Sequence, residues 1–183
     1  MNHLARICTA VLLCILPACS AQTAHHRKTQ PPPKPEPTAP ELFDYVRGQL
    51  LSLSPEDGIN DNIEVSWDPA TKIMTVREPG GHCDQFLNAL DTNTAVWDVF
   101  DPSDSVQQRD KLLRLTLISV SGKTGRTCYD KQNRVDPGLL GNRVRLLFSL
   151  DKAEEVPHFQ DKMAKAFKKL VVLSGGAPEQ DLF

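Results

Sequence analysis

A proline-rich run near the N-terminus limits where this chain can begin to fold. Six of the 14 prolines lie between Pro31 and Pro40. Proline fixes φ and has no backbone N–H, so such a run favours extended polyproline II and cannot build a hydrophobic core. We therefore interpret residues 19–40 as a tether, which at about 3.1 Å per residue spans up to roughly 60 Å. One folded domain is expected over residues 41–174, followed by a flexible tail over 175–183.

The segment before the tether is typical of an export signal. A short basic start ends at Arg6, and a nearly unbroken apolar run follows from Ile7 to Leu16. This order of a basic region, an apolar core and small residues is that of a secretory signal. The apolar run is shorter than the about 20 residues that a membrane-spanning helix needs. We predict that residues 1–18 are a signal peptide.

The signal segment closes with the tetrad Leu16-Pro17-Ala18-Cys19, an apolar residue three places before a cysteine with a small residue between. This tetrad resembles the lipobox of bacterial lipoprotein precursors, and the resemblance covers the signal segment alone. It implies that Cys19 becomes a lipid-modified N-terminus that anchors the protein to a bacterial membrane, facing the periplasm or the exterior. The alternative is cleavage after Ala21, since Cys19-Ser20-Ala21 fits a signal-peptidase site, and release as a soluble secreted protein.

Charge and motifs exclude several classes of function. The formal net charge is −2, from 21 basic and 23 acidic residues, whereas a nucleic-acid-binding domain needs a strongly basic face. We therefore expect no nucleic-acid partner. Gly122-Lys123-Thr124 resembles the end of a phosphate-binding loop, but the glycine needed five residues earlier is replaced by Leu117. We interpret these residues as a hairpin turn and expect no cofactor.

The domain contains only two of the five cysteines, Cys83 and Cys128. Two cysteines in an oxidising compartment most simply form a disulfide. The alternatives are two free thiols, or a metal site completed by His82 and His158. These residues lack the paired spacing that is typical of zinc ligands. We predict a Cys83–Cys128 disulfide and no metal site.

Hydrophobic periodicity predicts both helices and strands in the domain. Apolar residues at helical spacing predict helices over 41–53, 84–90 and 155–173, and Thr38 and Glu41 have the spacing of a capping box before the first. Alternating apolar and polar residues predict strands over 63–68, 73–77, 94–100, 112–120, 126–130 and 143–150. We expect strand 126–130 to return antiparallel to strand 112–120. The order favours an α+β domain, with an antiparallel sheet of about six strands packed on one face by N- and C-terminal helices.

Two loops are rich in acidic residues. The loop at residues 56–62 carries several oxygen ligands of the kind that calcium prefers, but it lacks the spacing of an EF-hand. Asp98, Asp101 and Asp104 crowd a second loop, where a carboxylate pair can serve acid–base chemistry. Their spacing of three residues defines no fixed geometry, so we interpret both loops as polar connections.

A small secreted or anchored hydrolase is an alternative function. His82 is a candidate general base, with the loop carboxylates as its partners, and Asp84 lies two residues away. However, no serine lies in a nucleophile-elbow pattern, and Cys83 is assigned to the disulfide. We therefore name no catalytic residue and favour a non-enzymatic role, with enzymatic activity left open.

A basic patch is the main candidate for binding. If strands 112–120 and 143–150 pair, Arg114 lies on the same side as Arg143 and Arg145, opposite the apolar rows, and Arg126 can join them. Guanidinium groups bind carboxylates and phosphates through paired hydrogen bonds. The alternative is a solvated sheet face balanced by nearby acids. The sequence thus suggests a membrane-anchored envelope lipoprotein whose domain binds an envelope protein or an anionic ligand.

Overall fold

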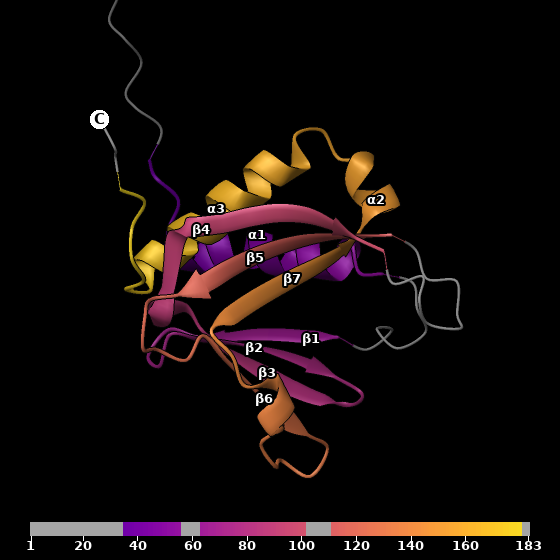
Figure 1. Ribbon diagram of the computed structural model, residues 1–183. Coiled ribbons are helices and arrows are strands. Elements are labelled where there is room, and N and C mark those ends of the chain that lie inside the picture. The colour runs from indigo at the N-terminus through magenta and orange to yellow at the C-terminus, as the bar shows by residue number, and fades with distance from the viewer. Residues whose placement is uncertain (1–34, 56–62, 102–110, 181–183) are drawn as a thin grey trace, which may run out of the picture. The chain divides into compact units, whose positions relative to one another are not determined.

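The structure is a computed structural model that describes residues 35–55, 63–101 and 111–180 (Figure 1). The chain divides into two units, residues 1–35 and 36–183, and the second contains the domain. The signal segment, Cys19, the tether up to residue 34, the acidic loop at 56–62 and Asp104 lie outside the described residues. Over the described ranges, no helix is long and apolar enough to cross a bilayer.

The domain is α+β, as predicted, but its strands form two antiparallel sheets instead of one. A four-stranded sheet has the order β1-β2-β3-β6, and a three-stranded sheet has the order β4-β5-β7. The strands are β1 (Glu64–Asp68), β2 (Ile73–Glu78), β3 (Gly81–Phe86), β4 (Leu90–Phe100), β5 (Leu112–Ser119), β6 (Arg126–Asp130) and β7 (Arg143–Ser149). The helices are α1 (Ala39–Ser52), α2 (Leu150–Glu154) and α3 (Phe159–Leu173).

Two local differences from prediction separate the sheets. Residues 84–90, predicted as a helix, instead complete β3 and form the 3₁₀ turn η1 (Leu87–Ala89), which redirects the chain into β4 of the other sheet. In addition, β6 pairs with β3 and not with β5. Gly81 permits this pairing, because a Cβ at that position would lie 2.0 Å from the carbonyl oxygen of Tyr129.

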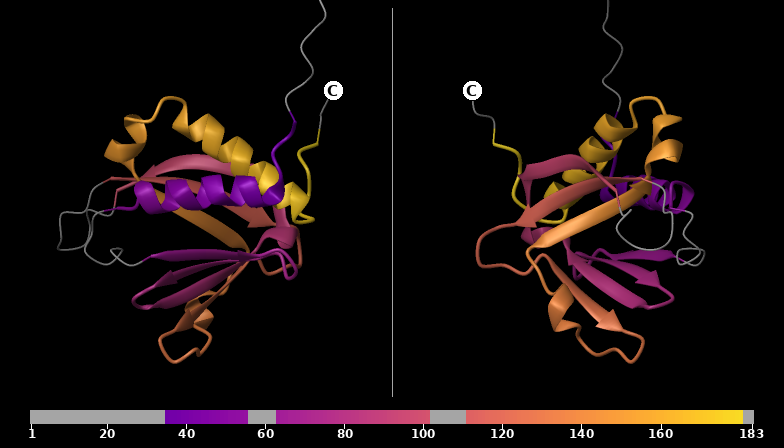
Figure 2. Two further views of the ribbon diagram at one scale, coloured as in Figure 1. Left: turned by 180° about the vertical axis from the view of Figure 1, so that it is seen from behind. Right: turned by 45° about the vertical axis from the view of Figure 1, so that its right-hand side comes forward.

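The hydrophobic core lies between the helices and the inner faces of the sheets. Figure 2 shows α1 and α3 covering one face of the three-stranded sheet. Alternate residues of β5 and β7 point into this core: Leu113, Leu115, Leu117, Val144, Leu146 and Phe148. The predicted apolar stripe of the last helix is buried against them. At the start of α1, the carboxylate of Glu41 accepts a 2.7 Å hydrogen bond from the backbone N–H of Thr38, as a capping box requires.

The helix predicted over residues 155–173 is confirmed from Phe159 onward but begins four residues later than predicted. Helix α2 ends at Glu154 and α3 begins only at Phe159. Pro157 disfavours a helical conformation at the residue before it and has no N–H to continue the helix. His158 then adopts a left-handed conformation with φ of +58°. The periodicity of the apolar residues revealed neither this later start nor the short separate helix α2.

The C-terminal segment was predicted to be flexible, yet residues up to 180 lie along the domain. The N–H of Ala177 donates to the carbonyl of Leu90 (2.9 Å), and the N–H of Thr92 donates to the carbonyl of Ala177 (3.2 Å). Lys168 of α3 forms an ion pair with Glu179 in this segment. Residues 181–183 lie outside the described residues.

Candidate anion-binding surface

The candidate site lies on the face of the three-stranded sheet that is turned away from α1 and α3, which we call the outer face. The predicted pairing of the two long strands is confirmed, because β5 pairs with β7 in a register that places Thr116 beside Arg145. The outer face carries Val96, Asp98, Phe100, Leu112, Arg114, Thr116, Ile118, Arg143, Arg145 and Leu147. Arg114, Arg143 and Arg145 therefore share one face, as the sequence suggested.

Arg114 is neutralised within this face. It pairs with Asp98 through two hydrogen bonds, one of them from Nε at 2.9 Å, and its guanidinium lies 5.1 Å from the centre of the Phe100 ring. The hydrogen bond from Arg114 lowers the pKa of Asp98 and raises the pKa of Arg114. Asp98 does not belong to the acidic loop with Asp101 and Asp104 but lies in β4, within the strand predicted over 94–100, directly opposite Arg114. Arg114 is therefore not a free cation.

The Asp98–Arg114 pair predicts a pH dependence of stability. The folded state lowers the pKa of Asp98 from 3.8, so the pair stabilises the fold above that value and loses its effect as pH falls through the lowered pKa. Asp98→Asn should therefore lower the free energy of unfolding at neutral pH by no more than about 1 kcal/mol, because the pair is partly exposed. Urea denaturation at several pH values should show this difference disappearing in acid. A constant difference down to pH about 2 would contradict the role of ionised Asp98.

Arg126 approaches the outer face from the other sheet. It begins β6, and its backbone exchanges hydrogen bonds of 3.0 and 3.2 Å with Gly141, just before β7. Its Nε is buried and has no hydrogen-bond acceptor within the part of the chain that the structure describes. Burial lowers the pKa of Arg126, and the positive charge of Arg145 lowers this pKa further. The positive charges of Arg126 on one sheet and Arg145 on the other therefore act on each other.

We call Arg126, Arg143 and Arg145 the arginine cluster. Arg143 and Arg145 are exposed and follow each other on one face of β7. No member of the cluster forms an ion pair with an acid among residues 35–55, 63–101 and 111–180. The charge of Arg145 also lowers the pKa of Asp98, but Asp98 is already paired with Arg114. Like charges without an ion-pair partner of their own favour the binding of an anion, which relieves their repulsion.

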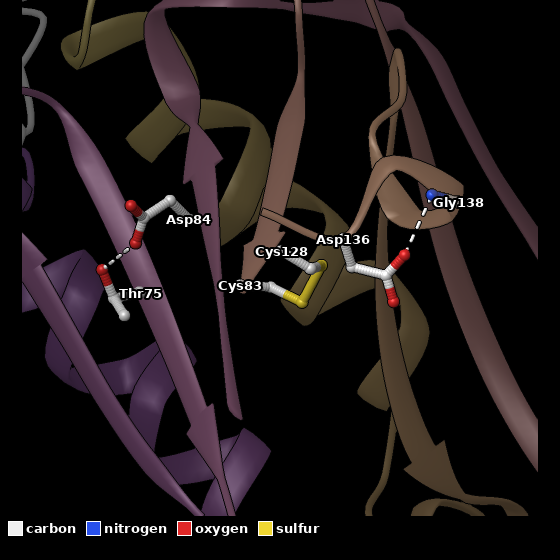
Figure 3. The surroundings of a disulfide bond; sticks show 6 residues. All are labelled: Thr75, Cys83, Asp84, Cys128, Asp136 and Gly138. Carbon is white, nitrogen blue, oxygen red and sulfur yellow. Dashed lines mark hydrogen bonds between the residues drawn. A yellow bond between two sulfur atoms is a disulfide. The ribbon is translucent and has the colours of Figure 1, made fainter. Parts of the chain in front are cut away.

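A disulfide fixes the strand that carries Arg126. Cys83 and Cys128 are bonded, as predicted, with an S–S distance of 2.02 Å, and they lie directly opposite each other on β3 and β6 (Figure 3). Cys128 is two residues from Arg126 on the same strand, and side chains two apart in a strand share a face. The disulfide therefore restricts the position of one member of the arginine cluster.

The residues proposed for hydrolysis do not come together in the described structure. His82 stacks on Tyr129 with ring centres 4.6 Å apart, and Asp84 accepts a 2.7 Å hydrogen bond from Thr75 (Figure 3). These residues belong to the four-stranded sheet, whereas Asp98 lies in the three-stranded sheet. His158 begins α3. No group of three or more His, Cys, Asp or Glu side chains suited to a metal occurs within the described ranges.

Comparison with protein-family models, with curated proteins and with solved structures finds no match to this chain. No family is assigned. Guanidinium groups supply fixed positive charge and several N–H donors, which suits recognition of carboxylates or phosphates better than proton transfer.

Proposed function

We propose that this protein is an exported bacterial lipoprotein whose domain binds an acidic partner protein in the cell envelope, without catalysis. The observation that carries the proposal is the arginine cluster. Arg126 and Arg145 come from different sheets, their charges interact, and neither forms an ion pair with an acid among the described residues. The lipobox-like tetrad that ends at Cys19 supports export and anchoring.

The surroundings of the cluster favour a protein partner over a small anion. Val96, Phe100 and Leu147 lie on the same outer face and are 59%, 41% and 41% exposed. A small anion would leave these apolar side chains in water. A protein segment would cover them and would place carboxylates against the arginines, and this combination of an apolar centre with arginines is common in protein interfaces.

Charge reversal at two members of the cluster tests the proposal. A photo-crosslinking amino acid at Thr116, between β4 and Arg145 on the outer face, should capture an envelope protein in intact cells. Arg126→Glu with Arg145→Glu should lower the yield of this product by about tenfold or more, because two charge-assisted contacts become repulsive. Arg134→Glu is the matched control, since Arg134 already pairs with Asp130 on the other sheet.

Crosslinking together with a hydrolysis assay separates the proposal from the hydrolase alternative. Equal capture by the double variant and by the Arg134→Glu control would overturn binding through the arginine cluster. Hydrolysis of ester or phosphoester substrates that is lost in His82→Ala would support the alternative instead. His82 is on the four-stranded sheet, so this substitution leaves the outer face unchanged.

Anchoring through Cys19 has a separate test. Cys19→Ala should abolish metabolic labelling of the protein with a fatty-acid probe, because lipid attachment requires the cysteine thiol. Cys14→Ala, within the apolar run of the signal, is the matched control and should keep full labelling. Labelling that persists in Cys19→Ala would overturn lipidation at Cys19. Absence of label from the unmodified protein would favour cleavage after Ala21 and release as a soluble protein.

A further inference from the structure

Strand β7 forms an edge of the three-stranded sheet and carries two members of the arginine cluster. An edge strand presents unpaired N–H and C=O groups that can pair with another chain. Figures 1 and 2 show β7 at the border of its sheet, with β5 on its other side. Backbone groups of β7 that do not bond to β5 are available to such a chain.

The hydrogen-bond register shows which residues of β7 point outward. The N–H of Ser119 donates to the carbonyl of Asn142, and the N–H of Leu150 donates to the carbonyl of Lys111. In this antiparallel register the backbone groups of the even-numbered residues of β7 therefore bond to β5. The backbone groups of odd-numbered residues then point away from β5. Ser149 confirms this, because its N–H donates 2.8 Å to the carbonyl of Leu53 at the end of α1.

Three consecutive outward residues remain open along β7. Arg143, Arg145 and Leu147 direct their N–H and C=O groups to the free edge, and none of these groups has a hydrogen-bond partner in the part of the chain described. The side chains of the same three residues are exposed on the outer face. A segment of five residues, about 17 Å of strand, is thus available for pairing.

We infer that the acidic partner binds by adding an extended strand to the free edge of β7 over Arg143, Arg145 and Leu147. This inference rests on the proposed function and specifies its binding mode. The partner's backbone bonds to the three outward residues. Its outer side chains lie beside those of β7, so an antiparallel partner has an apolar residue opposite Leu147 and acidic residues opposite Arg145 and Arg143.

The charges on this edge disfavour a second copy of the chain as the occupant. Two copies paired antiparallel about Arg145 would place this arginine opposite its own copy, and like charges directly opposite each other are destabilising. Charged residues also protect an exposed edge from unspecific pairing. The same arginines therefore select a strand of opposite charge.

A short synthetic peptide provides the test. The probe is an acetylated and amidated seven-residue peptide with the central sequence Val-Thr-Glu-Thr-Glu, added to the full chain as purified from its host. Two forms are compared, one N-methylated at both glutamates and one at both central threonines. In the predicted antiparallel pairing, the glutamate N–H groups donate to β7, whereas the threonine N–H groups point away.

We expect the probe to bind, methylation at the glutamates to weaken binding by about tenfold or more, and methylation at the threonines to have little effect. Amide hydrogen exchange at Arg143, Arg145 and Leu147 should slow on binding, while Val144 and Leu146, which already bond to β5, should change little. With Arg143→Glu and Arg145→Glu together, a probe with lysine in place of glutamate should bind instead.

Each other result overturns a defined part of the argument. No binding at millimolar peptide, or equal binding of the two methylated forms, would overturn strand addition but leave crosslinking at Thr116 as evidence for the arginine cluster. Equal binding of the glutamate and lysine probes by the unmodified protein would remove the charge recognition on which the proposed function depends.

Discussion

Replacing Cys83 and Cys128 together with alanine is expected to lower the free energy of unfolding by about 4 kcal/mol. The two cysteines are 45 residues apart in the sequence, and a disulfide that closes a loop of this length restricts the unfolded chain strongly. It also joins β3 to β6, one of the two edge strands of the four-stranded sheet. Without it, β6 is held by its hydrogen bonds to β3 and by short contacts with the loop before β7.

Urea denaturation of the unreduced protein, the reduced protein and the double alanine variant measures this effect. Reduction and substitution should give similar losses, because both remove the same constraint on the unfolded chain. Thiol counting on the denatured, unreduced protein should find neither Cys83 nor Cys128 free. A loss below about 1 kcal/mol would show that the reduced unfolded chain keeps residual structure that the disulfide would otherwise impose.

The local elements of this fold could be predicted because their signals lie within a few residues. The alternation in β1 and β2, the capping box at Thr38 and the apolar stripe of α3 each depend on neighbours along the chain. The disulfide could also be predicted, since only two cysteines remain in the domain. A short-range pattern was enough to predict each helix or strand, and the number of cysteines was enough to predict the disulfide.

The arrangement of strands could not be predicted in the same way. Whether β6 pairs with β5 or with β3 depends on the 3₁₀ turn at Leu87–Ala89 and on the close backbone approach at Gly81. Strands 112–120 and 126–130 look like a hairpin, because a short turn separates them. The disulfide places Cys83 and Cys128 on adjacent strands, and this constraint joins residues far apart in the sequence. Hydrophobic alternation within β6 would be the same beside β5 or beside β3, so it does not identify the neighbouring strand.

The candidate site shows the same division. The sequence placed Arg114, Arg143 and Arg145 on one face, because strand periodicity determines which residues share a face. It did not reveal that Asp98 neutralises Arg114 or that Arg126 approaches from the second sheet. Both facts depend on strand register across the fold. Within the described residues, the arginines of this surface that lack an ion-pair partner are therefore Arg126, Arg143 and Arg145, and Arg114 is not one of them.

Phe148→Ala is expected to lower the free energy of unfolding by about 3–5 kcal/mol, which is typical for removal of a buried aromatic ring. Phe148 is fully buried on the inner face of β7. Its ring meets Phe159 of α3 edge-on at 5.0 Å and lies 6.0 Å from the ring of Trp97 on β4. The substitution thus leaves a cavity between the three-stranded sheet and α3, where the surrounding rings cannot easily close.

Phe100→Ala is the matched control for this prediction. Phe100 belongs to the same sheet but lies on its outer face, is 41% exposed, and contacts the guanidinium of Arg114. Its removal should cost about 1–2 kcal/mol, because less buried area is lost than at Phe148, together with one partly exposed cation–π contact. Chemical denaturation of both variants measures the difference. Equal losses would mean that the outer face is packed as tightly as the inner face, which would contradict an outer face open to a partner.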